Sequence, residues 1–251
     1  MKTALNRMRY HSTLQSVQHL EHCTLHAVDG AIGTVEALYF DEVDWAVRYL
    51  LVDTGGWLRG RRVLISPVAV GEIRAEEQVI FIELTRAQIE TSPPLDPDQA
   101  VSRRYEEAYY RHYDWPVYWE ESRGFGAGLA QGSQQEKRLQ RTARVEGCLT
   151  VAADGAIGAV RDIFVDIRYW VIRYLEIEMR GIRPGRHVLV NTGWIERVNW
   201  VDRIVNIDLA CAAIHAAPAF DASRDISRDY EAGLFRHYGR RGYWQRGDGM
   251  H

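Results

Sequence analysis

The sequence repeats itself once, at an offset of 125 residues. The segment Asp29–Gly33 recurs without a gap at Asp154–Gly158, and the register holds to the end, where Tyr118-Trp119 recurs as Tyr243-Trp244. Solenoid repeats are roughly 20–50 residues long, so a period of this length indicates two copies of a whole domain. Whatever fold one copy adopts, the chain is therefore expected to contain it twice.

Composition narrows the class of protein. The chain has 251 residues, 46% hydrophobic and 26% charged, with a net charge of −3 and three cysteines. These values are typical of a globular protein and give no general attraction to nucleic acid or anionic lipid. No run approaches the roughly 20 apolar residues of a membrane span, and 1–10 lacks the apolar core of a signal peptide. An odd number of cysteines favours a reducing cytoplasm.

The repeat also sets the domain boundaries. We expect a first barrel domain with its C-terminal helix and tail at 17–120, and a second at 142–245. Between them, 121–141 holds four glycines and a run of Gln, Ser, Lys and Arg. Small and polar residues leave little to bury, so this stretch is predicted to be a flexible linker.

Each copy begins with signals for short antiparallel strands. Asp29-Gly30 and Asp154-Gly155 favour tight hairpin turns in which both central residues need positive φ. These turns join strand candidates at 23–28 and 32–40, and at 149–153 and 157–165. The next runs, 45–52 and 170–178, are rich in aromatic and β-branched residues, and 45–52 alternates with period 2. Shorter strand candidates lie at 62–65, 68–73 and 79–84, and again at 187–190, 194–198 and 204–209. This spacing predicts a mainly β chain with two tandem small six-stranded barrels.

A helical pattern follows each set of strands. Apolar or aromatic residues stand four apart at Val101, Tyr105, Tyr109 and Tyr113, and again at Ile226, Tyr230, Leu234 and Tyr238. This spacing predicts one short amphipathic, aromatic-rich helix per copy, capped at its N-terminus by Asp98 or Ser223.

The first copy resembles the PRC-barrel family, which is named for the cytoplasmic domain of the H subunit of photosynthetic reaction centres and also occurs in a ribosome maturation factor. The residues that carry the resemblance are Gly30-Ala31-Ile32-Gly33, Val35, Asp41, Trp45 to Val52, Gly56 and Arg62 to Pro67. The second copy matches at 155–158, Asp166, 170–177 and 187–190. It has Asn191-Thr192 in place of Ser66-Pro67, which puts the turn after that strand in doubt.

The resemblance implies a fold more strongly than a function, because the family shares a barrel and no active site. It implies an adaptor or assembly module that binds other macromolecules, in some cases at a membrane surface. The membrane-anchoring helix of the H subunit is not found here, and a second barrel replaces the N-terminal domain of the ribosome factor. Neither specific role is therefore carried over.

Four potential metal ligands cluster near the start of the first copy. His19, His22, Cys23 and His26 have spacings that would suit a transition metal on a helix. On a strand, however, adjacent residues point to opposite faces, and only the cysteine recurs, as Cys148. We therefore expect no metal and no other cofactor, and interpret the cysteine as a small packing residue.

Two arginines interrupt apolar strand faces and need partners. Arg48 and Arg173 each follow an aspartate, Asp41 or Asp166, by seven residues. A buried charge is costly without a counter-charge, so we expect a structural ion pair in each copy.

His112 and His237 recur within Arg-His-Tyr, each six residues after a glutamate, Glu106 or Glu231. Such a pair could do acid–base work, but this spacing puts the two side chains on different helix faces and no nucleophile recurs nearby. We predict no catalytic residue and no enzyme. The ring is expected to pack beside aromatic residues, with a nitrogen on solvent or a backbone carbonyl.

The aromatic tails are the better functional signal, because aromatic side chains are enriched at the energetic centres of interfaces. Either each tail covers a barrel, or it mediates association with another protein or a second copy of the chain. The candidates are Tyr105, Tyr109, Tyr113, Trp115, Tyr118 and Trp119, with Tyr230, Phe235, Tyr238, Tyr243 and Trp244 in the second copy.

The sequence therefore predicts a non-enzymatic interaction or assembly module, in the cytoplasm or at the inner face of a membrane complex. Its partners are expected to be other proteins or the chain itself. The alternative is a factor that binds RNA or the ribosome through basic clusters such as 59–62 and 236–246. Interleaved acidic residues disfavour nucleic acid as a partner.

Overall fold

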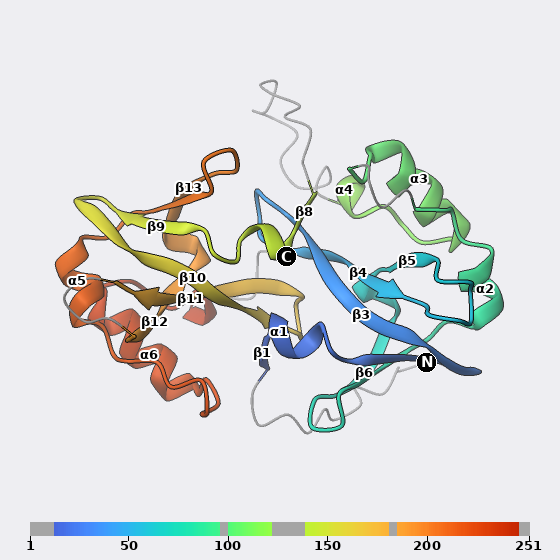
Figure 1. Cartoon of the computed structure of the whole chain (residues 1–251), viewed down its shortest axis with the longest axis horizontal. Helices are drawn as coiled ribbons and strands as arrows, with labels where there is room; N and C mark the ends of the chain where they lie inside the picture. The colour runs from blue at the N-terminus through green and yellow to red at the C-terminus, as the bar shows by residue number, and fades with distance from the viewer. Residues whose placement is uncertain (1–12, 96–99, 122–138, 181–184, 246–251) are drawn as a thin grey trace. The chain divides into compact units, whose positions relative to one another are not determined.

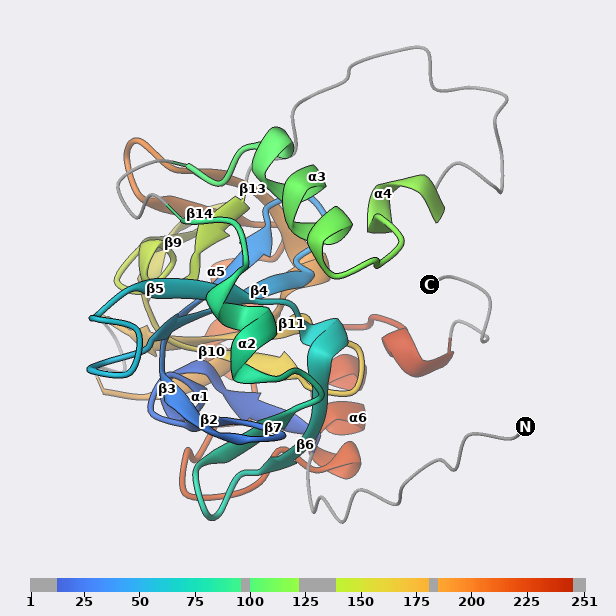
Figure 2. The same cartoon turned by 90° about the vertical axis from the view of Figure 1, so that its right-hand side faces the viewer.

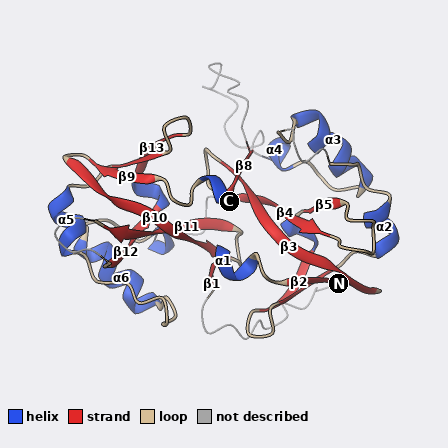
Figure 3. Ribbon diagram, in the orientation of Figure 1, coloured by secondary structure: helices blue, strands red, loops and turns tan. Residues whose placement is uncertain are grey.

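The computed structural model describes residues 13–95, 100–121, 139–180 and 185–245. Over these residues the chain is mainly β, with two seven-stranded sheets and short helices (Figures 1 and 3). It divides into two compact units. The N-unit comprises 19–141, and the C-unit comprises 142–245 together with 13–18 from the start of the described chain. The predicted fold class, two β domains with short helices, is confirmed.

Six strands of the N-unit follow the sequence pattern closely. They are β2 (Thr24–Ala27), β3 (Gly30–Asp41), β4 (Val47–Asp53), β5 (Arg62–Ile65), β6 (Val70–Arg74) and β7 (Val79–Ile82). Their order in the sheet is β5-β4-β3-β2-β7-β6, and neighbours are antiparallel except for the parallel pair of β2 and β7. A seventh strand, β8 (Leu139–Arg141), pairs with the end of β3.

The C-unit repeats this topology. Its strands are β9 (Leu149–Ala152), β10 (Gly155–Asp166), β11 (Val171–Met179), β12 (His187–Asn191), β13 (Ile195–Asn199) and β14 (Ile204–Ile207). Their order is β12-β11-β10-β9-β14-β13, with β9 and β14 parallel. The seventh strand here is β1 (Leu14–Ser16), which pairs with the end of β10.

These two extra strands were not predicted from the sequence, and each comes from the segment before the other repeat. The predicted linker 121–141 lies outside the described residues at 122–138, and its last three residues form β8. In Figure 1 the blue β1 belongs with the yellow β10, and the yellow-green β8 with the blue β3. The sheets therefore contain seven strands where six per copy were expected.

The hairpin turns lie one residue earlier than predicted. Ala27 is directly opposite Gly30 in the ladder, so Val28 and Asp29 are the central residues, and Asp29 does not have positive φ. Its Oδ1 instead accepts a hydrogen bond of 2.9 Å from the backbone N–H of Arg86. That contact caps helix α2 (Arg86–Glu90), and the equivalent Asp154 does the same for α5 (Cys211–Ala216).

The turn before β4 carries the unusual backbone. Trp45, predicted as the first residue of that strand, has φ +60°, and its counterpart Trp170 has φ +53°. Bulky residues rarely adopt positive φ. Because Trp45 and Trp170 both do so, this backbone conformation is a common feature of the turn in the two repeats. The strands begin two residues after Trp45, at Val47, and one residue after Trp170, at Val171.

The aromatic helices form as predicted, α3 at Arg103–His112 and α6 at Arg228–His237. Their N-caps are Ser102 and Ser227, whose hydroxyls accept backbone hydrogen bonds. Asp98, predicted as a cap, lies outside the described residues. Ser223 was wrongly predicted, because it sits four residues before the true cap and its hydroxyl bonds to Asp221.

The remaining elements are short. They are helices α1 (Val17–Leu20) and α4 (Tyr118–Glu121), and 3-10 turns at 67–69, 142–144, 192–194 and 243–245. Ser66 caps the turn at 67–69, and Asn191 caps the turn at 192–194 in the same way. The replacement of Ser66-Pro67 by Asn191-Thr192 thus preserves the turn, because either side chain can accept the capping hydrogen bond.

Two further findings bear on the class of protein. Within the described ranges, no helix is long and apolar enough to cross a membrane. All three cysteines are free thiols, and Cys23 and Cys148 are both fully buried.

Candidate functional site

Each barrel is covered by its own aromatic helix and tail. Helices α2 and α3 lie on the side of the N-unit sheet that faces the viewer in Figure 2. Tyr109 of α3 is fully buried, meets Tyr49 of β4 edge to face at 5.2 Å, and accepts a hydrogen bond from the backbone N–H of Ser66. Tail residues Trp115 and Trp119 pack on the same cluster. The tail is therefore part of the N-unit's own hydrophobic core.

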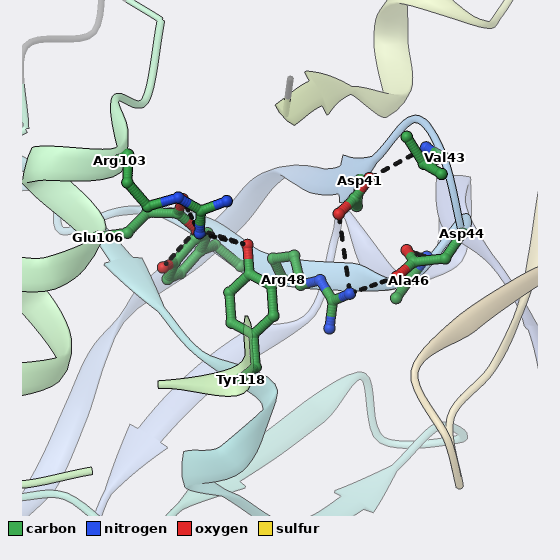
Figure 4. Close-up of polar contacts among 9 residues, drawn as sticks. Asp41, Val43, Asp44, Ala46, Arg48, Arg103, Glu106 and Tyr118 are labelled. Atoms are coloured by element: carbon green, nitrogen blue, oxygen red, sulfur yellow. Dashed lines mark hydrogen bonds and ion pairs between the residues drawn. The ribbon is translucent and has the colours of Figure 1, made fainter. Parts of the chain in front are cut away.

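A buried carboxyl group joins helix, tail and sheet. Glu106 of α3 is 2% exposed, and its Oε1 accepts hydrogen bonds from the hydroxyls of Tyr49, at 3.2 Å, and Tyr118, at 2.9 Å. Its Oε2 lies 3.1 Å from a guanidinium nitrogen of Arg103 (Figure 4). A charged acceptor in an apolar setting needs such partners, and here it has three. We call this arrangement the glutamate clasp.

The C-unit contains the same clasp with shorter distances. Glu231, also 2% exposed, accepts hydrogen bonds of 2.7 Å from the hydroxyls of both Tyr174 and Tyr243. Arg228 lies 2.9 Å from its other oxygen. The same contacts occur in both units although the surrounding residues differ, so the clasp is a shared structural feature of the two domains.

Burial controls the titration of the clasp. Removal from water raises the pKa of Glu106, while Arg103 and the two tyrosine hydroxyls act in the opposite direction. The pKa of Tyr49 is raised far above its ordinary value, first by burial and then by the nearby Glu106. Tyr174 is affected in the same way beside Glu231. These hydroxyls therefore stay protonated and act only as hydrogen-bond donors to the carboxylate.

Arginines stack on the tail rings above the clasp. The guanidinium of Arg48 lies 4.0 Å from the ring centre of Tyr118, and that of Arg103 lies 4.1 Å from Trp119. In the C-unit the corresponding distances are 4.3 Å for Arg173 over Tyr243 and 4.4 Å for Arg228 over Trp244. Contacts of this length are favourable cation–π interactions. We call each set of two arginines and two rings an arginine–aromatic ladder.

The two predicted ion pairs are long contacts. Arg48 Nη2 lies 3.8 Å from Asp41 Oδ2, and Arg173 Nε lies 3.8 Å from Asp166 Oδ2. Arg48 is closer to Asp44, at 2.6 Å, a partner that the sequence interpretation missed (Figure 4). Asp41 and Asp166 also accept a hydrogen bond from the backbone N–H two residues later, within the turn. Burial raises the pKa of Asp166.

The other interface candidates pack within their own units. The Tyr105 hydroxyl donates to the carbonyl of Pro93, and the rings of Tyr113 and Trp115 stack at 4.7 Å. In the C-unit, Phe235 and Tyr238 both contact Trp194. Like Trp115, the ladder rings Tyr118, Trp119, Tyr243 and Trp244 are only half-buried.

The structure keeps the recurring glutamate and histidine of each aromatic helix apart, as their spacing predicted. Glu106 faces the sheet, whereas His112 Nε2 lies 2.9 Å from the carbonyl oxygen of Gln88 and its ring packs on Tyr113. His237 has the same contacts with Ala213 and Tyr238. This is the packing interpretation proposed from the sequence.

The four potential metal ligands are spread over different elements. His19 on α1 bonds to the carbonyl of Ala75, and the thiol of Cys23 donates to the carbonyl of His19. His22 lies in the turn after α1, and His26 on β2 packs against the ring of Phe81. In the described part of the chain, no three His, Cys, Asp or Glu side chains are grouped as metal ligands.

Sequence reasoning missed one recurring structural arginine. Arg61 donates to the backbone carbonyls of Glu90 and Ser92, and Arg186 donates to those of His215 and Ala217. Both contacts satisfy free carbonyls at and beyond the end of α2 or α5. The available signal was that Arg61 recurs as Arg186 at the repeat offset of 125 residues.

A second group was missed because it occurs once. In the C-unit, buried Asp162 and Glu176 are directly opposite on β10 and β11, where the N-unit has Ala37 and Leu51. Glu176 Oε1 lies 2.5 Å from Nδ1 of His187. Burial raises the pKa of both carboxyl groups.

Comparison with known proteins agrees with this geometry. Residues 26–89 match the PRC-barrel domain family. A stretch of 71 residues is 37% identical to an uncharacterized protein of Deinococcus radiodurans, and covers 28% of this chain and 25% of that relative. The chain thus spans a quarter of the length of that relative. The C-unit, outside the family match, is assigned as a second barrel by its strand order.

Proposed function

We propose that this chain, with a PRC-barrel domain at 26–89 and a second unit of the same topology, is a non-enzymatic module that binds and assembles other proteins. The proposed setting is the cytoplasm, including the periphery of a membrane complex. PRC-barrel domains are typically non-catalytic, which supports the first part of the proposal. The family match itself does not identify a partner.

The duplicated arginine–aromatic ladder is the observation that carries the proposal. Tyr, Trp and Arg are the residue types most enriched at interface hot spots. In this chain they alternate on a half-buried surface, once per unit. The glutamate clasp holds one ring of each ladder by a hydrogen bond of 2.9 or 2.7 Å, so little side-chain entropy remains to be lost on binding.

The polar groups of the site also favour binding over catalysis. Oε1 of Glu106 accepts from two hydroxyls, and Oε2 faces Arg103. A general base needs a free lone pair within reach of a substrate proton. Both oxygens of Glu106 already contact groups of the strand, the helix and the tail, so the role of the clasp in this proposal is to position the ladder.

A protein partner is favoured over RNA by the contacts of the basic residues. Arg61 bonds to backbone carbonyls, Arg62 pairs with Glu36, and Arg240 pairs with Asp208. Arg103 and Arg228 are held by the clasps. Phosphate binding needs cations that are available to the backbone, and these side chains already have acidic or carbonyl partners.

The test is affinity purification of the tagged full chain from its native cells, with soluble and membrane fractions analysed separately. Trp119→Ala with Trp244→Ala should reduce recovery of a defined protein at least tenfold. Trp57→Ala is the matched control, because this half-buried ring also lies under an arginine, Arg86, but outside both ladders. Equal recovery by the double variant, or loss of the co-purified material after nuclease treatment, would refute the proposal.

A further inference from the structure

The pairing of β1 and β8 is a reciprocal exchange between the two repeats. Each of these strands precedes one repeat in the sequence and completes the sheet formed by the other. Leu14, Gln15 and Ser16 pair with Asp166, Val165 and Phe164, and Leu139, Gln140 and Arg141 pair with Asp41, Phe40 and Tyr39. Both members of each pair shift by one repeat length, so the register is identical.

Side-chain contacts hold β1 in the C-unit. The hydroxyl of Ser16 donates to Asp162 Oδ2 at 2.5 Å, and Gln18 Nε2 donates to the carbonyl of Arg161 at 3.0 Å. The backbone N–H of Ile167 donates to the carbonyl of Thr13, which extends the ladder by one pair. The exchanged segment is thus bound along its whole length.

Different side chains hold β8 in the N-unit. Gln140 Nε2 donates to Glu42 Oε2 at 2.9 Å, and Arg141 Nε donates to the Tyr39 hydroxyl at 2.6 Å. The guanidinium of Arg141 also lies 5.2 Å from the Tyr39 ring centre. The third strand residue is Ser16 in β1 and Arg141 in β8, and the two side chains bond to different acceptors, Asp162 and Tyr39. The strand pairing is therefore the same in both units although these side-chain contacts differ.

Buried residues lie within two positions of each crossing. The chain passes from the C-unit to the N-unit between Gln18 and His19, with Val17 and Leu20 fully buried. It returns between Arg141 and Thr142, with Gln140 5% exposed and Thr142 fully buried. Neither exchanged strand is a loosely attached terminus.

We propose that each repeat is a strand-exchange module whose partner is a second copy of the same repeat, and that the tandem chain is a covalently closed form of such a pair. The docking surfaces are the final three residues of β3 and of β10. Each accepts a three-residue strand from the other half of the chain. The two halves therefore bind one another without the peptide connection between them. This inference is independent of the arginine–aromatic ladders.

The test cuts the folded full chain. A specific protease site is inserted after Gly128, and the cleaved protein is analysed by size-exclusion chromatography with mass determination. We expect both fragments to elute together at the mass of the intact chain, 28.9 kDa. Elution as two separate fragments would overturn the proposal.

Proline variants test whether the exchanged strands are what holds the two fragments together after cleavage. The Ile167–Thr13 hydrogen bond, with the alternation of an antiparallel ladder, places Gln15 in a hydrogen-bonded pair, and the shared register does the same for Gln140. Gln15→Pro with Gln140→Pro removes both donors and should weaken fragment association at least tenfold. Gln15→Ala with Gln140→Ala keeps them and should retain it. Fold is checked by circular dichroism before cleavage, and unchanged association of the folded proline variant would also reject the proposal.

Discussion

The hydroxyl of Tyr174 donates a hydrogen bond of 2.7 Å to Glu231, from the middle of a strand to a helix 57 residues later. The same contact joins Tyr49 to Glu106, at 3.2 Å. It fixes the helix to the sheet at a point from which water is excluded, and the tail ring is bound to the same carboxylate. The position of each ladder therefore depends on one buried acceptor.

Tyr174→Phe is expected to destabilise the protein by about 1.5–3 kcal/mol, because a hydrogen bond to a charged and buried acceptor is lost. Tyr230→Phe is the matched control, since that hydroxyl donates to a neutral carbonyl at 3.5 Å and its loss should cost about 0.5–1 kcal/mol. Urea unfolding of both variants measures the two losses. Equal losses of unfolding free energy would show that the hydrogen bond to Glu231 stabilises the protein no more than one to a neutral carbonyl.

Gly33→Ala should destabilise the protein by about 3 kcal/mol, because an added Cβ would lie 1.9 Å from the carbonyl oxygen of Asp53. The strands pass too closely for a side chain, and Gly158 approaches Glu178 in the same way, at 2.0 Å. Gly56→Ala is the control, with no atom within 4 Å of the added carbon. Thermal unfolding should show a large loss for the first variant and almost none for the control.

Arg48→Met is expected to cost about 1–2 kcal/mol, since it removes the stacking on Tyr118 and a cation beside the fully buried Asp41. Asp44→Asn breaks the shorter but exposed ion pair and should cost less than about 0.5 kcal/mol. Unfolding is measured at low and high salt. A larger loss for Asp44→Asn would mean that the surface pair, and not the stacked and buried contact, holds Arg48.

Glu176→Leu places the residue type of the N-unit in the C-unit and should stabilise the protein by about 1–2 kcal/mol at pH 7. The raised pKa of Glu176 means that the folded state binds its proton more tightly than the unfolded state does. Wild-type stability should therefore rise, relative to the variant, as pH falls through the raised pKa towards the ordinary value of 4.5.

Urea midpoints of both proteins between pH 7 and the ordinary Glu pKa of 4.5 test this expectation. The advantage of the variant should shrink continuously on acidification. A stability advantage of the variant that stays constant or grows on acidification would show that burial does not raise the pKa of Glu176.

Much of the fold could be predicted because it is encoded locally. The alternation in Val47–Asp53 and the four-residue spacing from Val101 to Tyr113 reflect which faces are buried, and both elements form. The caps were harder to predict, since several serines and aspartates precede each helix and only the backbone direction selects Ser102 or Ser227.

The candidate site could be predicted only in part from the sequence. Spacing along α3 suggested comparing Glu106 with His112, whereas the partners of Glu106 are Tyr49 and Tyr118, on a strand and in the tail. A hydrogen bond across 57 residues leaves no mark in local periodicity. The recurrence of both tyrosines at the repeat offset was visible, but it could not show what they contact.

The sequence by itself determined that there are two copies of one small β domain, because period-2 burial and a constant offset are properties of the chain read in order. Only the tertiary structure decided which copy completes which sheet. A three-residue strand such as Leu14–Ser16 pairs through its backbone, and the edges offered by β3 and β10 have the same register. Identical local sequence signals are therefore compatible with self-pairing or exchange, and the choice is made by the path of the folded chain.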